Sequence, residues 1–367
     1  MRAVAPLLAL VACVQAHGDA KRELAERQRF LELHPNHLGH CAEEHASSGL
    51  IERAIKRRAA RAAEMHRLHV RQTSSVNKSH KEDKPYTTST DPKVVFAGNN
   101  SCILSPESTE GPFYVLGETI RSTIVDDQNG VPLHLDFQLI DVQTCKPLKG
   151  VFIEMWNANS TGVYSGALAT VNGIGMSDKA NLDRAFLRGA QMTDDDGVAQ
   201  FSTLFPGHYE GRAPHIHVMV HSGATAQANN TLWHTKATHA GQMFFDQSLV
   251  DAVKKTAPYS TNRQNLMKNA ADNILLAEAA TSDPFFHYVL LGGGDNLAKD
   301  GVFAWFTLGV NQTFTRDIMA VAMRMKEGGK MVTTNPKVPG LDQIFPGGFP
   351  TAYQPGYGAP AKPSGRG

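Results

Sequence analysis

Short apolar runs separated by turn residues characterise residues 100–222. The turn signals DDQNG, TDDDG and FPG divide four such runs, which are HLDFQLIDV (134–142), VFIEMWNA (151–158), VAQFSTLF (198–205) and HIHVMV (215–220). Runs of this length at regular spacing predict the strands of an antiparallel β-sandwich. FHYVLLGG and VFAWFTLGV, within 286–310, predict two further strands, whereas residues 245–280 are expected to be helical or irregular.

Residues 50–70, LIERAIKRRAARAAEMHRLHV, show the spacing of an amphipathic helix. One face collects apolar side chains, and most of the basic residues fall elsewhere; the apolar positions are Ile51, Ile55, Ala59, Ala62 and Met65. One interpretation is a helix that binds a polyanion or a membrane surface. The alternatives are a helix that packs on the main domain and a pro-segment with a dibasic site at Lys56-Arg57-Arg58. We favour these two, because charge runs are usually solvated faces.

The chain is therefore predicted to be mainly β, with an antiparallel β-sandwich core, a helical N-terminal segment and an irregular tail. Composition shifts place the boundaries. The predicted segments are a signal peptide (1–16), a basic helical segment (17–71), a polar linker (72–92), the β-sandwich domain (93–325) and a Pro/Gly-rich tail (326–367).

Several features indicate an exported protein. The first sixteen residues, MRAVAPLLALVACVQA, have a basic start, a short apolar stretch and a small-x-small ending, which is typical of a secretory signal peptide. Five N-x-S/T sequons suit the same compartment, at Asn77, Asn99, Asn159, Asn229 and Asn311. The formal net charge of +1 gives no reason to expect nucleic acid or an anionic membrane as a partner. We expect a secreted protein, with the oligomeric state left open between monomer and homodimer.

The chain has four cysteines, of which Cys13 leaves with the signal peptide. Cys102 and Cys145 flank the start of the β domain, and an oxidising compartment favours a disulfide between them. Cys41 then has three alternatives: a free thiol, an intermolecular bond, or loss through further processing.

The stretch GRAPHIHVMV (211–220) carries the first candidate chemistry. Successive side chains of a strand point to opposite faces, so His215 and His217 share one face, opposite Ile216 and Val218. Two tyrosines lie upstream, Tyr164 after a strand and a turn, and Tyr209 in FPGHYEGRAPHIH. A phenol with a pKa near ~10 ligates only an ion that strongly stabilises its anion, and ferric iron is the obvious candidate. His221 would lie on the same face, and we expect it to be structural.

These stretches resemble the intradiol ring-cleaving dioxygenases of the catechol 1,2- and protocatechuate 3,4-dioxygenase type, and most of all their secreted fungal relatives. The similarity runs in order over most of 100–250, through ESTEGPFYVLGE (107–118), EMWNANSTGVYSG (154–166), FLRGAQMTDDDGVAQFSTLFPGHY (186–209), RAPHIHV (212–218) and HAGQMFFD (239–246). The resemblance implies the β-sandwich of that family, an Fe(III) cofactor, and an aromatic vicinal diol and O2 as substrates. The ring would be cleaved between its two hydroxylated carbons to a muconate-type diacid.

The resemblance also implies the roles of individual residues. The iron ligands would be Tyr164, Tyr209, His215 and His217, with Tyr209 leaving the metal when substrate binds. Arg212 would lie beside the substrate ring and stabilise negative charge there, and Gln242 would orient Arg212 or a ligand. Phe113 and Tyr114 fall where the family lines the mouth of its pocket. Every candidate ligand lies within 164–217, so residues 20–71 are expected to be dispensable for the chemistry.

Two departures leave the substrate open. The W-H-A-N of many relatives is W-N-A-N here, with Asn157, and the loop from Tyr209 to His215 is much shorter than in the bacterial enzymes. Catechol, hydroxyquinol and larger plant or lignin phenols all remain candidates.

Two alternatives come from other classes of protein. Cleavage after Ala16 would expose His17, and an N-terminal histidine can bind copper as in a secreted copper monooxygenase. A non-catalytic β-sandwich that binds glycans or plant phenolics would use the histidines only structurally. Neither alternative accounts for the order of two tyrosines and two histidines.

Overall fold

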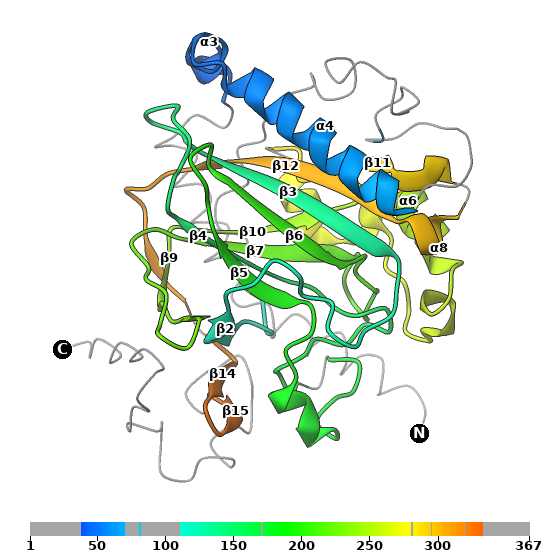
Figure 1. Cartoon of the computed structure of the whole chain (residues 1–367). Helices are drawn as coiled ribbons and strands as arrows, with labels where there is room; N and C mark the ends of the chain where they lie inside the picture. Colours follow the sequence, from blue (N-terminus) through cyan, green and yellow to red (C-terminus); the bar gives the residue numbers. More distant parts are fainter. Residues whose placement is uncertain are drawn as a thin grey trace, which may run out of the picture.

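The computed structural model describes residues 38–69, 81, 111–169, 172–279, 282–294, 296–318 and 320–332. Its centre is a pair of four-stranded sheets packed face to face (Figure 1). One sheet has the order β11-β12-β3-β6, formed by His287–Leu290, Val302–Val310, Pro132–Asp141 and Val198–Leu204. The other has the order β10-β7-β4-β5, formed by His239–Phe244, His215–His221, Phe152–Trp156 and Arg188–Met192. The predicted mainly β sandwich is confirmed.

The strands of the two sheets run antiparallel to their neighbours, except that β12 is parallel to β3. Strands predicted from the apolar runs agree with β3, β4, β6, β7, β11 and β12. Strands β5 and β10 were not predicted, because their polar and glycine residues break the apolar pattern.

The core lies between the two sheets and follows the alternation of each strand. Leu133, Leu135, Phe137 and Leu139 of β3 face Ile216, Val218 and Val220 of β7 within one buried cluster. Helix α6 (Gln247–Lys254) closes this core with Leu249, Val250 and Val253. The predicted orientation of Ile216 and Val218 is confirmed, so β7 turns its histidines toward the opposite, outer face of the sheet.

Helix α4 (Leu50–His69) lies across the outer face of the β11-β12-β3-β6 sheet (Figure 1). Its residues Ile55, Ala62 and Met65 pack against Phe303 and Trp305 of β12. This confirms the packing interpretation of the basic segment. Its arginines pair with carboxylates: Arg53 with Asp196, Arg57 and Arg58 with Asp136, and Arg61 with Glu64.

The predicted disulfide between Cys102 and Cys145 is wrong, because Cys145 is bonded to Cys41. Leu38, Cys41 and Leu50 fold back onto Ile140, Val142 and Cys145 in one buried cluster. This brings two residues together that are 104 positions apart, with their Cα atoms 5.1 Å apart. Sequence spacing could not show this contact, because it depends on the packing of the N-terminal segment on the sandwich. Cys102 lies outside the described residues.

Shorter elements surround the sandwich. In the first half of the chain these are η1 (Gly39–Cys41), α3 (Ala42–Ser47), β1 (Val115–Leu116), β2 (Glu118–Thr119) and η2 (Lys179–Asp183). Later in the chain they are β8 (Thr231–Leu232), β9 (Lys236–Ala237), η3 (Tyr259–Thr261), η4 (Asn269–Ala271), α7 (Asn273–Ala279), η5 (Leu291–Gly294), α8 (Leu297–Asp300), β13 (Arg316–Asp317), β14 (Ala322–Met325) and β15 (Gly328–Met331). Helical and irregular structure within 245–280 is confirmed.

The hairpin of β14 and β15 crosses the expected boundary between domain and tail at 325/326, and β14 pairs with β1. The signal peptide, His17, all of the linker except Lys81, and the tail from 333 onward lie outside the described residues.

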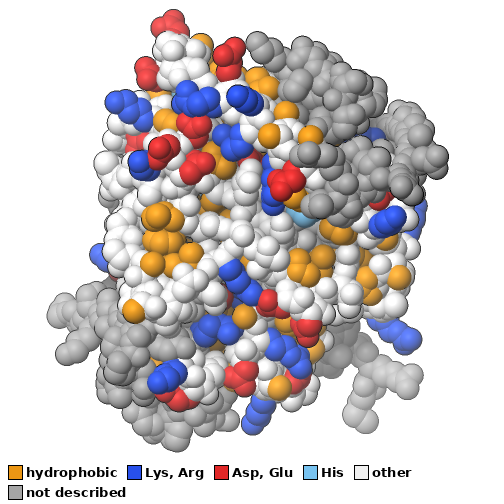
Figure 2. Space-filling view, in the orientation of Figure 1, with side chains coloured by type: hydrophobic (Ala, Val, Ile, Leu, Met, Phe, Trp, Pro, Cys, Tyr) orange, Lys and Arg blue, Asp and Glu red, His pale blue; other side chains and the backbone are white. Residues whose placement is uncertain are grey.

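Charges of both signs are mixed on the face of the molecule shown in Figure 2, which agrees with the near-zero formal net charge. No helix among the described residues combines the length and the apolar character needed to cross a membrane.

Candidate metal centre

The outer face of the β10-β7-β4-β5 sheet carries the predicted site. The register aligns Gln242 of β10 with His217 of β7, His217 with Trp156 of β4, and Trp156 with Arg188 of β5. Directly opposite residues share a face of the sheet, so these four side chains form one row across it. The ring of Trp156 stacks on that of His217, with centroids 4.9 Å apart and planes 3° apart. His217 therefore lies between Gln242 and the stacked ring of Trp156.

The four predicted metal ligands converge at one end of this row. His215 Nε2 lies 3.0 Å from His217 Nε2, 3.5 Å from Tyr164 Oη and 3.4 Å from Tyr209 Oη. An ion about 2.1 Å from each of its ligands holds neighbouring ligand atoms about 3–3.5 Å apart. The three distances from His215 Nε2 are therefore those expected between ligands of one metal ion.

The histidines present the correct nitrogen atoms. His215 Nδ1 lies 2.6 Å from the carbonyl oxygen of Ala213, so Nδ1 carries the proton and donates it. This leaves the lone pair of Nε2 free to bind a metal. Gly111 allows a close approach to the other ring, because a Cβ atom at this position would lie 3.0 Å from Cε1 of His217.

Loops outside the sheets supply the tyrosines. Tyr164 follows β4, and Asn172 binds its backbone on both sides: Oδ1 accepts the amide at 2.9 Å and Nδ2 donates to the carbonyl at 2.8 Å. Asn181 Nδ2 donates to the same carbonyl at 2.8 Å. Tyr209 lies between β6 and β7, where Asn262 Nδ2 donates to the carbonyl of His208 at 2.7 Å. Side-chain amides thus take over the backbone hydrogen bonds that a strand would otherwise make.

The electrostatics of the site favour a bound cation. Tyr164 and Tyr209 are buried, and burial raises the pKa of Tyr164 well above its ordinary value, with the neighbouring Tyr209 adding to the shift. Two phenols so close together would ionise only beside a strong positive charge. The donor set of two phenol oxygens and two imidazole nitrogens fits a hard, highly charged ion such as Fe(III).

Arg212 and Gln242, the two predicted non-ligand residues, contact each other. Arg212 Nη2 donates to Gln242 Oε1 at 2.6 Å, and its Nε donates to Asp272 Oδ2 at 2.8 Å. Burial alone would lower the pKa of the Arg212 guanidinium, but Asp272 holds it above its ordinary value. The arginine therefore keeps its charge in a buried position beside the ligands.

Sequence reasoning missed Asp272. Its only sequence signal is its position before the helical pattern NILLAEA, where an aspartate commonly caps a helix. The cap is present, since Oδ1 accepts the amides of Ile274 and Leu275 at 2.9 and 3.0 Å. Nothing in the sequence connects this carboxylate with Arg212, sixty positions earlier.

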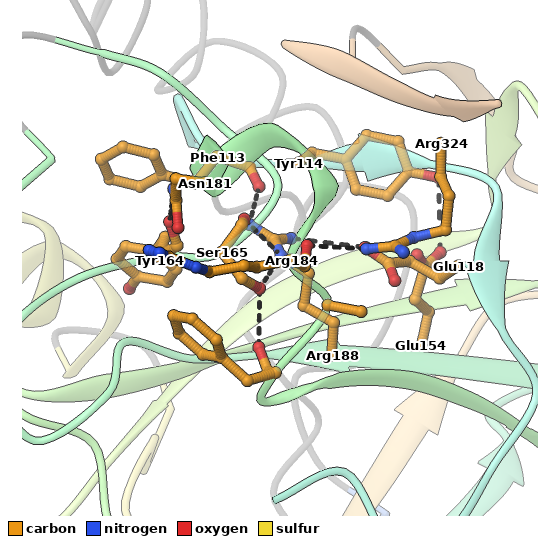
Figure 3. A network of polar contacts seen from close by, with 12 residues as sticks. Phe113, Tyr114, Glu118, Glu154, Tyr164, Ser165, Asn181, Arg184, Arg188 and Arg324 are labelled. Atoms are coloured by element: carbon orange, nitrogen blue, oxygen red, sulfur yellow. Dashed lines mark hydrogen bonds and ion pairs between the residues drawn. The ribbon is translucent and has the colours of Figure 1, made fainter. Parts of the chain in front are cut away.

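The two candidate pocket residues have different surroundings. Phe113 stacks on Tyr164 with centroids 4.3 Å apart and meets Tyr209 edge-on, so it is part of the site. The hydroxyl of Tyr114 instead donates to Glu154 Oε2 at 3.3 Å, in a buried network beside the site (Figure 3). Its ring lies 5.4 Å from that of Trp156, which in turn stacks on His217. His221 shares the outer face as expected, and its ring lies between Glu154 Oε2 and the carbonyl of Lys236.

Comparisons with known proteins concern the part of the chain that holds the predicted site residues. A protein-family model described as "Dioxygenase" matches residues 109–254, which include every predicted site residue. Catechol 1,2-dioxygenase 1 of Acinetobacter lwoffii is 33% identical over 156 residues, covering 41% of this chain and 44% of that protein. The catechol 1,2-dioxygenase of Acinetobacter baylyi is 32% identical over 111 residues, covering 29% and 32%. The chain thus spans less than half the length of these curated relatives.

Among solved structures, the intradiol ring-cleavage dioxygenase from Tetranychus urticae is 33% identical. The match covers 58% of this chain and 97% of that chain, with a TM-score of 0.47. Together with the match of the family model across the four predicted ligands, these sequence identities show that the chain belongs to the intradiol ring-cleavage dioxygenase family.

Proposed function

We propose that this protein is a secreted, Fe(III)-dependent intradiol dioxygenase. It would cleave a small aromatic vicinal diol with O2 between the two hydroxylated carbons and release a muconate-type diacid. The observation that carries the proposal is the convergence of Tyr164, Tyr209 and His217 on His215 Nε2, all within 3.5 Å. The relatives named catechol 1,2-dioxygenase make catechol the first substrate to test, followed by hydroxyquinol and larger plant phenols.

The donor set accounts for the choice of metal and for its open positions. Two phenolates and two neutral imidazoles would leave one net positive charge on Fe(III) and room for a chelating diol. When bound, the ion would acidify both hydroxyls of the diol and make the ring reactive toward O2. Tyr209 Oη, as the departing ligand, would accept one of the diol protons.

The surrounding residues complete the chemistry. The guanidinium of Arg212 is 3% exposed, so its positive charge acts in a site that excludes water. Such a fixed charge stabilises negative charge that develops on the ring more strongly than it would in solvent. Gln242 and Asp272 hold Arg212 from two directions. Phe113, flat against Tyr164, forms an apolar wall of the site.

Secretion is supported by the disulfide between Cys41 and Cys145 and by the five sequons. Disulfides persist in oxidising compartments and are rare in the cytosol. The test is expression in a eukaryotic secretory host, where the protein is expected in the medium; retention of a folded protein inside the cells would contradict the proposal.

The test of the chemistry combines metal analysis, visible spectra and oxygen uptake on the purified protein. Phenolate ligands give Fe(III) a visible absorption band, so the wild type is expected to be reddish and to consume O2 with a catechol. Tyr164→Phe should weaken both colour and iron binding, because an anionic ligand is lost. Tyr209→Phe should retain much of the iron but lose activity. His215→Ala and His217→Ala should empty the site.

Two results would overturn the proposal. A colourless protein without oxygen uptake on any catechol of the panel would indicate a binding module, and bound copper in place of iron would indicate the copper alternative. Full iron and activity in His215→Ala and His217→Ala would show that these histidines are structural.

A further inference from the structure

Arg188 lies in the same row of the sheet as the proposed ligand His217, with Trp156 between them. It is 1% exposed, although it stands on β5 at the edge of its sheet. A fully buried arginine is expensive unless its donors are satisfied and its charge is compensated. The hydrogen bonds and the ion pair of Arg188 therefore indicate the role of this buried side chain.

The donors of Arg188 bind two segments that border the proposed metal (Figure 3). Nε donates to the carbonyl of Ser165 at 2.8 Å and lies 3.2 Å from Ser165 Oγ. Nη2 donates to the carbonyl of Phe113 at 2.7 Å. Ser165 follows Tyr164 in the chain, and the ring of Phe113 is stacked on that of Tyr164. One guanidinium thus ties the loop that carries Tyr164 to the wall that its ring rests on.

The charge of Arg188 is compensated away from the metal. Nη1 lies 3.7 Å from Glu118 Oε1, and both side chains are 1% exposed. The planar guanidinium can therefore face Glu118 with one nitrogen while the other two hold backbone carbonyls. A lysine cannot reproduce this, because its single ammonium group lacks the fixed fork of donors.

We propose that Arg188 is a positioning residue for Tyr164, setting the direction of the phenol by fixing both the backbone after it and the aromatic wall beside it. This inference rests on the proposed function in one respect, namely that Tyr164 is a metal ligand. Arg188 touches neither the metal nor the substrate, and it acts through Ser165 and Phe113.

The test compares Arg188→Lys with the matched control Arg324→Lys in the full chain. Arg324 is a second arginine near Glu118. Burial raises the pKa of the Glu118 carboxyl, and the charges of Arg188 and Arg324 partly offset this rise. Its Nη2 donates to the carbonyl of Arg184 at 2.7 Å, and among the described contacts Arg324 has no hydrogen bond to Ser165 or Phe113. The control therefore changes an arginine beside the same carboxylate while leaving the contacts of Tyr164 intact.

The first readout needs no metal. Tyr164 and Tyr259 are both buried, so neither should react with tetranitromethane in the metal-free wild type or in Arg324→Lys. In Arg188→Lys, peptide mapping should find Tyr164 nitrated at least several-fold faster, while Tyr259 in the sandwich core stays protected. The second readout uses protein loaded with Fe(III). Arg188→Lys should show a weaker visible band per iron and lose iron to a chelator about tenfold faster.

Unchanged nitration and an unchanged band in Arg188→Lys would overturn the inference. If Tyr259 also becomes reactive, the variant has unfolded, and Arg188→Gln decides instead, because it removes the fork of donors to Ser165 and Phe113 but keeps a polar group: selective nitration of Tyr164 supports the inference, and its absence overturns it. A wild type that takes up no Fe(III) would refute the proposed function alone, because the nitration of metal-free protein still decides whether Arg188 positions Tyr164.

Discussion

The carboxylate of Asp272 contacts both the charged residue of the site and the backbone before its first histidine. Oδ2 accepts hydrogen bonds from Arg212 Nε and from the amide of Ala213, each at 2.8 Å. The carbonyl of Ala213 in turn orients His215. Asp272 is 1% exposed, so each of these hydrogen bonds is shielded from water.

If the protein is an Fe(III) dioxygenase as proposed, we expect Asp272→Asn to reduce oxygen uptake about tenfold or more while most of the iron is retained, because Arg212 loses its charged partner but the four proposed ligands remain. The measurements are turnover and iron content on the same preparations. Asp251→Asn is the matched control, since its partner Lys268 is half-exposed and the ion pair contributes little. Equal losses in the two variants would exclude a specific role for Asp272.

Two of the sequons in the described part of the chain differ in the exposure of their asparagine side chain. Asn229 is exposed, whereas Asn311 is 2% exposed and its Oδ1 accepts the amide and the hydroxyl of Thr313. If the protein is secreted as proposed, glycopeptide mapping should find a glycan on Asn229 and none on Asn311. A glycan on Asn311 would contradict the buried position of this side chain.

At the scale of elements, α4 is joined to the sandwich by a buried ion pair. Arg58 Nε lies 3.2 Å from Asp136 Oδ1, with side-chain exposures of 1% and 0%, and Arg58 Nη2 donates to Thr307 at 3.1 Å. The apolar side of the helix covers Phe303 and Trp305. The expectation that residues 20–71 are dispensable for the chemistry stays a prediction, and a chain lacking α4 would expose this face of the sheet.

Arg58→Met should lower the free energy of unfolding by about 3 kcal/mol, since a buried carboxylate loses one of its two arginines. Arg53→Met should cost about 0–1 kcal/mol, because its ion pair with Asp196 is solvated. Urea denaturation at neutral pH compares the two variants. Similar values for both would show that α4 is not held by its buried charges.

The disulfide attaches the same N-terminal segment at its other end. Cys41→Ser should cost about 3–5 kcal/mol, because the bond closes a loop on the order of 100 residues in the unfolded chain. Peptide mapping without reduction should recover Cys41 linked to Cys145. A peptide linking Cys102 to Cys145 would contradict this structure.

At the scale of the whole molecule, the sequence predicted what depends on local periodicity. Alternation along 215–220 correctly placed the histidines on one face, and the apolar runs correctly gave the sandwich. Contacts set only by packing could not be predicted. The Cys41–Cys145 bond, the parallel pairing of β12 with β3, and the contact of Asp272 with Arg212 each join segments that are far apart in the chain.

Stability at acid pH depends on buried groups that the fold prevents from taking up protons. His239 is buried near Arg316, and burial together with that charge lowers its pKa from 6.5 to about 3. For Asp136, burial favours protonation, but Arg57 and Arg58 outweigh it and lower the pKa below its ordinary value. In both cases the unfolded chain binds a proton at a higher pH than the folded protein does.

The sign of the effect follows from this difference. Stabilisation from His239 is complete above its unfolded pKa of about 6.5 and is lost as the pH falls toward its folded value. Asp136 adds a further loss only below an unfolded pKa of about 3.9. Each group contributes a slope of up to about 1.4 kcal/mol per pH unit within its own range. Between pH 6 and 4, His239 therefore contributes to the pH dependence of the free energy of unfolding, and Asp136 does not.

His239→Gln should accordingly flatten the loss of stability between pH 6 and 4, and Asp136→Asn should leave that interval unchanged. Urea denaturation at pH 8, 6, 5 and 4 measures the free energy of unfolding of the wild type and both variants. Each variant is referred to its own value at pH 8, where histidines are neutral, so any general cost of the substitution cancels. If His239→Gln keeps the slope of the wild type between pH 6 and 4, His239 is protonated in the folded protein. The acid sensitivity must then come from other buried histidines such as His45 and His208, whose pKa values are also lowered chiefly by burial.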